Sequence, residues 1–162
     1  MTTGYTRTQI ALHWLVAILI AVQFLMADGI GEAWDALKEG EAAEGGGGGV
    51  WLHILVGFAI LGLVIWRLAL RSSQGVPPPP TGESAAQVMV AKVTHGLLYL
   101  VMILMPLSGG AAWFAGIGPA MAVHQLGKLA LLVLVGLHVL GAVYNHFMLR
   151  NGLLARMTRP RG

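Results

Sequence analysis

Residues 124–149 read HQLGKLALLVLVGLHVLGAVYNHFML, and this stretch decides the fold class. Its only Lys, Arg, Asp or Glu is Lys128. A run of about 20 predominantly apolar residues is long enough to cross the roughly 30 Å of hydrocarbon in a bilayer as a helix. Lipid offers no hydrogen-bond partners to an open backbone, so a single chain segment spans it as a helix. The stretch therefore predicts a transmembrane helix.

Three further apolar stretches, at about residues 9–27, 50–70 and 88–107, have the same character. Of the 162 residues, 56% are hydrophobic and 10% are charged, against about 25% charged in an ordinary soluble domain. This excludes a soluble enzyme and predicts one all-α integral membrane domain over residues 1–162, a four-transmembrane-helix bundle. The first stretch exceeds the roughly 7–15 apolar residues of a secretory signal, so we expect it to be retained.

Charges in the loops predict the orientation. Six acids and one base, Lys38, lie in residues 28–49, whereas bases outnumber acids in residues 67–92 and the C-terminal tail holds four arginines and no acid. By the positive-inside rule both termini are cytoplasmic, and the acidic loop and an uncharged loop at 109–123 face the other side. The basic residues behind the net charge of +3 then lie at a membrane surface, so we expect them to contact lipid and not nucleic acid. We expect a multi-pass protein of the bacterial inner membrane.

Two low-complexity stretches have simple interpretations. The five glycines at 45–49 predict a flexible tether before the second span. The four prolines at 77–80 predict a stiff, extended spacer in the cytoplasmic loop.

The chemistry of this chain depends on its six histidines, because it has no cysteine. The absence of cysteine excludes disulfides, iron–sulfur clusters and covalently attached c-type haem. The histidines lie within the predicted spans or at their ends: His13, His53, His95, His124, His138 and His146. Taken singly, each could serve as an interhelical hydrogen-bonding group. As a set they predict a functional site, because polar side chains inside a membrane are costly.

The spacing of His124 and His138 predicts two sites on one helix. Fourteen residues put both side chains on nearly the same face, about 21 Å apart along the axis. His53 lies near the outer end of its span and His13 near the inner end of its own, which allows an outer pair, His53 with His124, and an inner pair, His13 with His138. Zinc or copper held by three or four imidazoles does not fit this spacing.

Two stacked bis-histidine sites suit two haems, and glycine or alanine follows each of these four histidines by three or four positions, where a macrocycle needs room. One alternative stays open. Counted from the predicted span ends, His13 lies about 7 Å deep, His138 about 18 Å and His146 about 6 Å, so depth alone favours His146 as the partner of His13.

Several stretches resemble the bacterial cytochrome b561 family over nearly the whole chain. They are Tyr5–Arg7, Ala11–Leu15, His53, His95–Leu100, Met105–Gly109, His124 with His138, and His146–Met157. The resemblance implies two b haems, one held by His53 and His124 and one by His13 and His138. It also implies electron transfer with ubiquinone, or superoxide oxidation on the periplasmic side with electrons passed to quinone.

The chain departs from the family pattern at three places. Gln125 stands where Glu often follows the first histidine of the last span, and Asn145-His146 stands where two histidines are common. The outer loop is acidic and would repel an anion such as superoxide, which Lys128 alone would oppose.

We therefore expect a quinone-linked oxidoreductase that moves electrons between ubiquinone or menaquinone and a periplasmic donor, either superoxide or a protein. His95, His146, Arg67 and Arg71 are candidate neighbours of the quinone or the haems. Two alternatives stay open: a cytochrome b subunit that anchors a separate dehydrogenase, and a haem-free small transporter or scaffold.

Overall fold

The computed structural model describes residues 4–26, 29–40 and 47–160. Its elements, in chain order, are α1 (Arg7–Leu25), α2 (Ile30–Lys38), α3 (Gly47–Gln74), α4 (Ala85–Ala115), α5 (Gly118–Tyr144), a π-helix η1 (Asn145–Leu149) and a 3-10 helix η2 (Leu154–Met157). Four of them, α1, α3, α4 and α5 with its continuation to Leu149, are long and apolar enough to cross a membrane. The predicted all-α membrane fold with four spans is confirmed.

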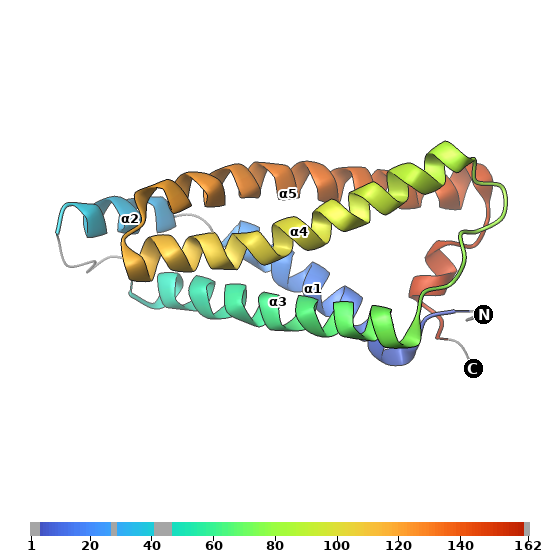
Figure 1. The fold of residues 1–162 in the computed structure, drawn as a ribbon, viewed down its shortest axis with the longest axis horizontal. Coiled ribbons are helices and arrows are strands. Elements are labelled where there is room, and N and C mark those ends of the chain that lie inside the picture. Colours follow the sequence, from blue (N-terminus) through green and yellow to red (C-terminus); the bar gives the residue numbers. More distant parts are fainter. Residues whose placement is uncertain (1–3, 27–28, 41–46, 161–162) are drawn as a thin grey trace.

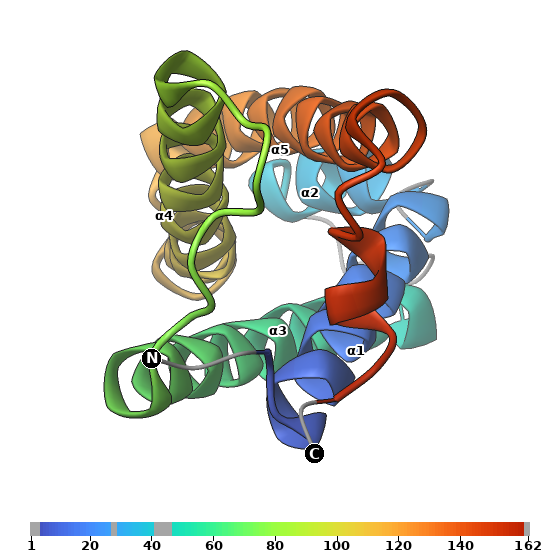
Figure 2. The same cartoon turned by 90° about the vertical axis from the view of Figure 1, so that its right-hand side faces the viewer.

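The four long helices form an antiparallel bundle (Figure 1). Viewed along its axis, α1 lies against α3, α3 against α4 and α4 against α5 (Figure 2). Both termini lie at one end of the bundle, and α2 lies at the opposite end. The end with the termini carries the arginine-rich segments and is called the inner end; the end with α2 is called the outer end.

The third and fourth spans are longer than predicted, and the loop expected at 109–123 is largely helical. Pro106 lies inside α4 without ending it, as membrane helices tolerate. The helix ends at Gly116, whose left-handed φ of 65° an ordinary residue disfavours. Pro119 then stands in the first turn of α5, where its missing N–H costs nothing. The connection shrinks to two residues, which draws α4 and α5 into a tight hairpin.

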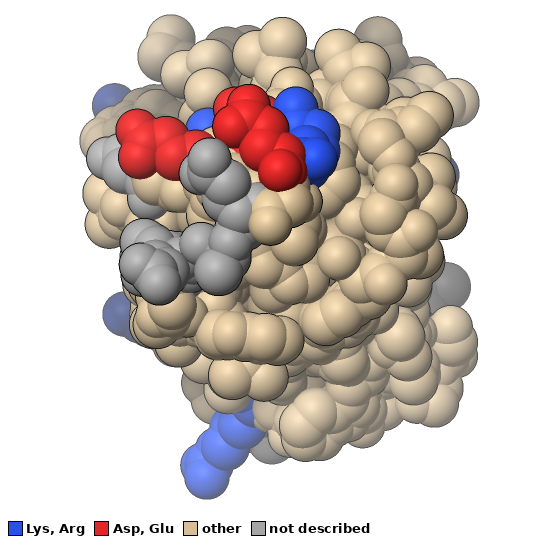
Figure 3. Space-filling model, turned by 90° about the vertical axis from the view of Figure 1, so that its left-hand side faces the viewer, with Lys and Arg blue, Asp and Glu red and all other residues tan. Residues whose placement is uncertain are grey.

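The helix α2 was not predicted. Its apolar face buries Ala33 and Trp34, while Glu32 and Asp35 are exposed, and Lys38 pairs with Asp35 at 2.8 Å. Figure 3 shows the acidic side chains gathered on the outer end. The tether prediction was wrong for residues 47–49, which form the first turn of α3. The remaining predicted loop features, Asp28, Glu41, Glu44 and the glycines at 45 and 46, lie outside the described residues.

The best-buried part of the bundle lies midway along it, where α1, α3 and α4 meet. Val16, Ile60 and Val64 form this cluster, with Tyr99 and Met102 packed against it. Most large apolar side chains elsewhere are exposed, as expected for helices that face lipid. Along α1 and α3, the cluster separates the histidines near the inner end from those near the outer end.

The segment after α5 folds back across the inner end. Trp14 of α1 donates its indole N–H to the carbonyl of Met157 at 2.8 Å, and Arg156 donates to the carbonyl of Pro78 at 2.6 Å. Arg150 adopts a left-handed conformation (φ 48°) and makes the turn possible. The C-terminal segment thus connects α1 with the proline-rich loop.

Candidate cofactor sites

The outer site is formed by His53 of α3 and His124 of α5. Their ring centres are 6.1 Å apart, and the ring planes make an angle of 72°. The Nδ1 atom of His124 lies 2.8 Å from the carbonyl oxygen of Met105, so this nitrogen carries the proton and donates it. The other ring nitrogen, Nε2, is then left with its lone pair available to a metal.

Two glycines make room for this arrangement. A Cβ atom at Gly109 would lie 2.9 Å from Nδ1 of His124, and a Cβ at Gly127 would lie 2.5 Å from the sulfur of Met105. Both distances are shorter than a carbon tolerates without displacing its neighbour. The two glycines therefore leave the space that the His124 ring and the Met105 side chain occupy.

His53 is held differently. Its backbone carbonyl accepts a hydrogen bond of 2.8 Å from the side chain of Gln23 on α1. The ring atom Nδ1 of His53 is buried and has no hydrogen-bond partner among the described residues. The outer site thus contains one histidine with a fixed proton and one whose second nitrogen is unpartnered.

The inner site is formed by His13 of α1 and His138 of α5. Their ring centres are 6.0 Å apart, with 64° between the ring planes. His13 lies six residues after the start of α1, and His138 lies six residues before Tyr144, where α5 gives way to η1. The two rings thus meet although the fourth span continues past Tyr144 to Leu149, a pairing that depth counted from the predicted span ends did not favour.

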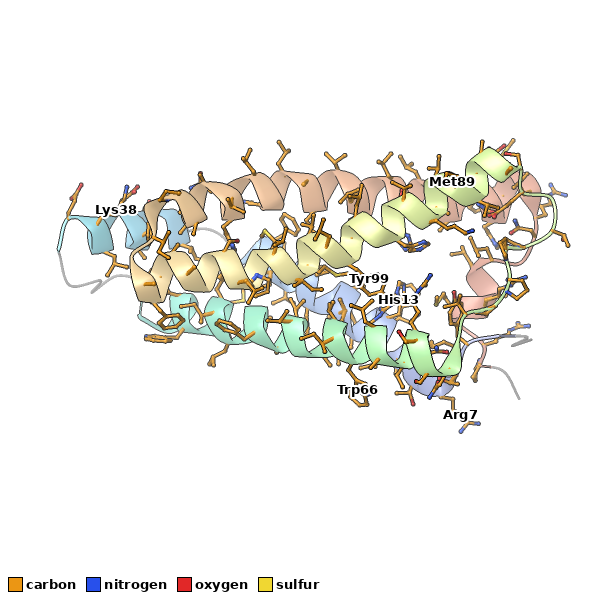
Figure 4. All side chains as sticks on the ribbon, in the orientation of Figure 1. Arg7, His13, Lys38, Trp66, Met89 and Tyr99 are labelled. Carbon is orange, nitrogen blue, oxygen red and sulfur yellow. The ribbon has the colours of Figure 1, made fainter. Side chains whose placement is uncertain are left out.

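A third imidazole belongs to the inner site. The ring of His95 on α4 lies 5.0 Å from that of His138, in an edge-to-face contact. His13 and Tyr99 point into the bundle, whereas Met89, Trp66 and Arg7 point away from it (Figure 4). The indole of Trp14 meets His13 edge to face at 5.4 Å.

His146 lies apart from these groups. It stands in η1, its side chain is exposed, and its ring contacts that of Phe147 at 4.8 Å. Its neighbour Asn145 is buried and donates to the carbonyl of Gly141 at 3.1 Å. Of the two histidines weighed as partners for His13, the structure brings His138 to it.

Positive charge surrounds the inner site. Arg67 of α3 acts electrostatically on all three inner histidines, and Arg71 acts on His95 and on Tyr5. Burial raises the pKa of the Tyr5 phenol above its ordinary value of 10.0, and the charge of Arg71 opposes the rise. The Tyr5 hydroxyl therefore stays protonated at neutral pH and can donate a hydrogen bond.

Both histidine pairs fit haem b. An imidazole nitrogen binds a transition metal at about 2.0–2.1 Å and lies roughly 1.2 Å from its ring centre, so two rings on opposite sides of one ion have centres about 6.5 Å apart. The observed 6.1 and 6.0 Å are within a few tenths of an ångström of this separation. Among the described residues, no group of three or more His, Asp or Glu side chains lies close enough together to hold one metal ion.

Three features of these sites were not predicted from the sequence. The Met105 carbonyl carries no signal in a sequence, because every residue has one. Gln23 did have a signal, since an amide within an apolar span needs a hydrogen-bond partner. Tyr5 and Trp14 entered only within stretches quoted for the family resemblance, yet the charge of Arg71 acts on Tyr5, and Trp14 binds the C-terminal segment.

Comparisons with known proteins give the family of the chain. The family model described as prokaryotic cytochrome b561 matches residues 4–160. A protein named cytochrome b562 from Cereibacter sphaeroides is 37% identical over 98% of this chain and 97% of its own length. A probable superoxide oxidase from Yersinia pestis is 28% identical over the full length of both chains, and cytochrome b561 homolog 1 of Escherichia coli is 24% identical over 94% of this chain and 96% of its own.

The family match, the four spans and the paired histidines lead to one conclusion. The family implies haem b as cofactor, membrane electron transfer as function and the bacterial inner membrane as location. The chain belongs to the prokaryotic cytochrome b561 family.

Proposed function

We propose that this chain holds two b haems, one between His53 and His124 and one between His13 and His138, and passes electrons from a donor at the outer end to a quinone at the inner end. The observation that carries the proposal is that two histidines of α5, His124 and His138, lie about 21 Å apart along the helix and that each faces a histidine of another helix. From the positive-inside rule we expect the inner end to face the cytoplasm.

Haem b held by two histidines has no open position on the iron, so it supplies one-electron transfer rather than oxygen binding. The residues of the chain set the geometry. The Met105 carbonyl keeps the proton of His124 on Nδ1, and the short α4–α5 connection holds both helices at the outer site. At the inner site, the guanidinium of Arg67 offers a positive charge to an acidic group of the cofactor.

The quinone would bind beside the inner site, near His95 and Tyr5. Reduction of a quinone takes two electrons and two protons, so the site needs groups that donate hydrogen bonds to two carbonyl oxygens. The imidazole of His95 and the protonated phenol of Tyr5 can both donate. Arg71 lies close enough to both for its charge to favour a partly reduced, negatively charged headgroup.

The first test is the haem content of the protein purified in detergent. A pyridine haemochrome should give two b haems per chain, and His95→Gln should keep both while reducing the rate at which a ubiquinone analogue oxidises the reduced protein. Loss of the inner haem in His95→Gln would instead make His95 a haem ligand. Absence of haem after expression with ample haem supply would overturn the proposal and favour a transporter or scaffold.

One specific substrate is a second candidate. The relative from Yersinia pestis carries the name probable superoxide oxidase, and Lys128 places a positive charge near His53 at the outer site. The acidic face of α2 at the same end acts against an anionic donor. Rapid mixing of the oxidised protein with superoxide distinguishes the two kinds of donor. Haem reduction that becomes slower in Lys128→Gln supports a superoxide oxidase. Absence of haem reduction favours a protein donor, as in the alternative of an anchor subunit.

A further inference from the structure

Gln23 is a polar side chain at an unusual position, near the outer end of α1 and against the turn of α3 that begins at His53. Its amide nitrogen donates to the carbonyl of His53 at 2.8 Å. The same nitrogen would lie 3.4 Å from a Cβ atom at Gly57, so the amide rests directly on this turn. Such an amide is costly in a membrane unless its hydrogen-bonding groups are used.

Two buried polar atoms at this contact have no hydrogen-bond partner among the described residues: Oε1 of Gln23 and Nδ1 of His53. They belong to two residues that are already joined by the hydrogen bond from the Gln23 side chain to the His53 backbone, and their chemistry is complementary. A carboxamide oxygen only accepts, and an imidazole Nδ1 that carries the proton donates. Buried groups of this kind require a partner, and each could be the partner of the other.

The outer histidines differ in this respect. The Nδ1 proton of His124 is fixed by the carbonyl of Met105, whereas Nδ1 of His53 has no hydrogen-bond partner among the described residues. Histidines that bind metals almost always donate the other ring N–H to an acceptor, which fixes the tautomer and makes the ligand more basic. The unused oxygen of Gln23 is a buried acceptor on the side chain that already holds the His53 backbone.

We propose that Gln23 is a positioning residue for the outer haem site: its Oε1 accepts the Nδ1 proton of His53, directly or through one water, while its Nε2 holds the His53 backbone. The proton on Nδ1 leaves Nε2 of His53 free to face His124. This inference rests on the proposed function, because it concerns the strength of His53 as a haem ligand. It differs from a simple α1–α3 tie, which needs the Nε2 contact alone.

The test is a redox titration of purified Gln23→Leu and Gln23→Glu, with the inner haem as the reference within each sample. An acceptor on the ligand's second nitrogen makes the imidazole more electron-donating and stabilises ferric iron. Leu removes the acceptor and should raise the outer midpoint potential, by about 59 mV for a tenfold change in the ferric-to-ferrous preference. Glu keeps an acceptor oxygen and should leave that potential at or below the wild-type value.

Gln125→Leu is the matched control, because it removes an amide from the exposed surface of α5 beside His124 and should change neither midpoint. If both Gln23 variants shift the outer midpoint in the same upward direction, the helix tie explains the result and the proposal is wrong. If Gln23→Leu loses the outer haem, Gln23→Glu decides between the two explanations. An outer haem that Gln23→Glu retains, with a midpoint no higher than in the wild type, supports the acceptor role of Gln23. Loss of the outer haem from Gln23→Glu as well overturns it.

The two levels of inference fail differently. Wild-type protein with fewer than two haems overturns the proposed function and this inference together. Two haems in the wild type, with an unchanged outer midpoint in a fully loaded Gln23→Leu variant, overturn only the role of Gln23.

Discussion

The outer and inner histidine pairs have almost the same separation, 6.1 and 6.0 Å, but they lie in different surroundings. The outer pair is set by uncharged groups, a backbone carbonyl and a carboxamide, and its end of the bundle carries the acidic helix α2. The inner pair has a third imidazole, the charge of Arg67 and a covering segment from the C-terminus. Similar ligand geometry is thus combined with different electrostatics, because Lys128 and the acidic side chains of α2 oppose each other at the outer end, whereas the charges of Arg67 and Arg71 act together at the inner site.

This difference predicts the order of the two reduction potentials. A nearby positive charge favours the reduced iron, which carries one positive charge less, whereas acidic surroundings favour the oxidised iron. We expect the inner haem to have the higher midpoint, so that electrons move downhill from the outer donor toward the quinone. A redox titration that gave the outer haem the higher midpoint would reverse the proposed direction.

The largest expected effect comes from removing one ligand of each pair. His53→Ala should lose the outer haem and keep the inner one, and His13→Ala should do the reverse, because each pair spans one site. The haem-to-protein ratio and the low-spin spectrum of each variant measure this. His146→Ala is the control, since His146 is exposed and in contact with Phe147; loss of a haem there would revive it as the inner ligand.

A second change acts on the outer site alone. Gly109→Ala places a carbon 2.9 Å from Nδ1 of His124, which forces the ring away from Met105. Loss of such a supporting hydrogen bond costs about 10–100-fold in metal affinity, so the outer haem should dissociate in a haem-transfer assay while the inner one stays. Gly62→Ala, where a Cβ meets nothing within 4 Å, should leave both haems bound; equal loss of both haems in Gly109→Ala would point to misfolding instead.

A third change tests the charge of the inner site. Arg67→Gln removes a positive charge that acts on both His13 and His138, so the inner midpoint should fall, by about 59 mV for a tenfold change in the one-electron equilibrium. The outer midpoint should stay within the error of the titration. Arg7→Gln is the control, because Arg7 points away from the bundle (Figure 4). An equal fall of both midpoints would mean that Arg67 acts on the whole membrane face.

The smallest expected effect concerns the covering segment of the inner end. Trp14→Phe keeps an aromatic ring and removes the hydrogen bond to Met157, a loss of about 1 kcal/mol. Hydrogen exchange in residues 153–158 should then become about fivefold faster, with no change at the outer end. Trp66→Phe, on an outward-facing and exposed side chain, should not change exchange there.

The four spans and the face shared by His124 and His138 could be predicted because membrane insertion and helical periodicity are properties of the local sequence. The ends of the helices could not. Pro106, which ends a helix in water, remains inside α4 here, and the last turn of the fourth span is a π-helix. The positions at which these helices end depend on contacts between segments that are distant in the sequence.

The same limit applies to the sites. The pairing of His53 with His124 followed from depth and spacing, and the structure brings these rings together; their role as haem ligands stays a prediction. The pairing of His13 with His138 followed from the resemblance rather than from depth. The approach of His95 to His138 and of Gln23 to His53 depends on how α4 and α1 turn about their axes, which the weak amphipathicity of membrane helices leaves open.

The contact between Trp14 and Met157 has a consequence for biosynthesis. It joins residues 143 positions apart, so it forms only after the ribosome has completed all four spans and the segment that follows them. The outer pair can meet as soon as the first turns of α5 have entered the membrane, whereas the inner end closes last. Interruption of translation after α5 would therefore yield chains whose outer half is complete and whose inner half is open. The inner half is the one that we expect to deliver electrons to quinone.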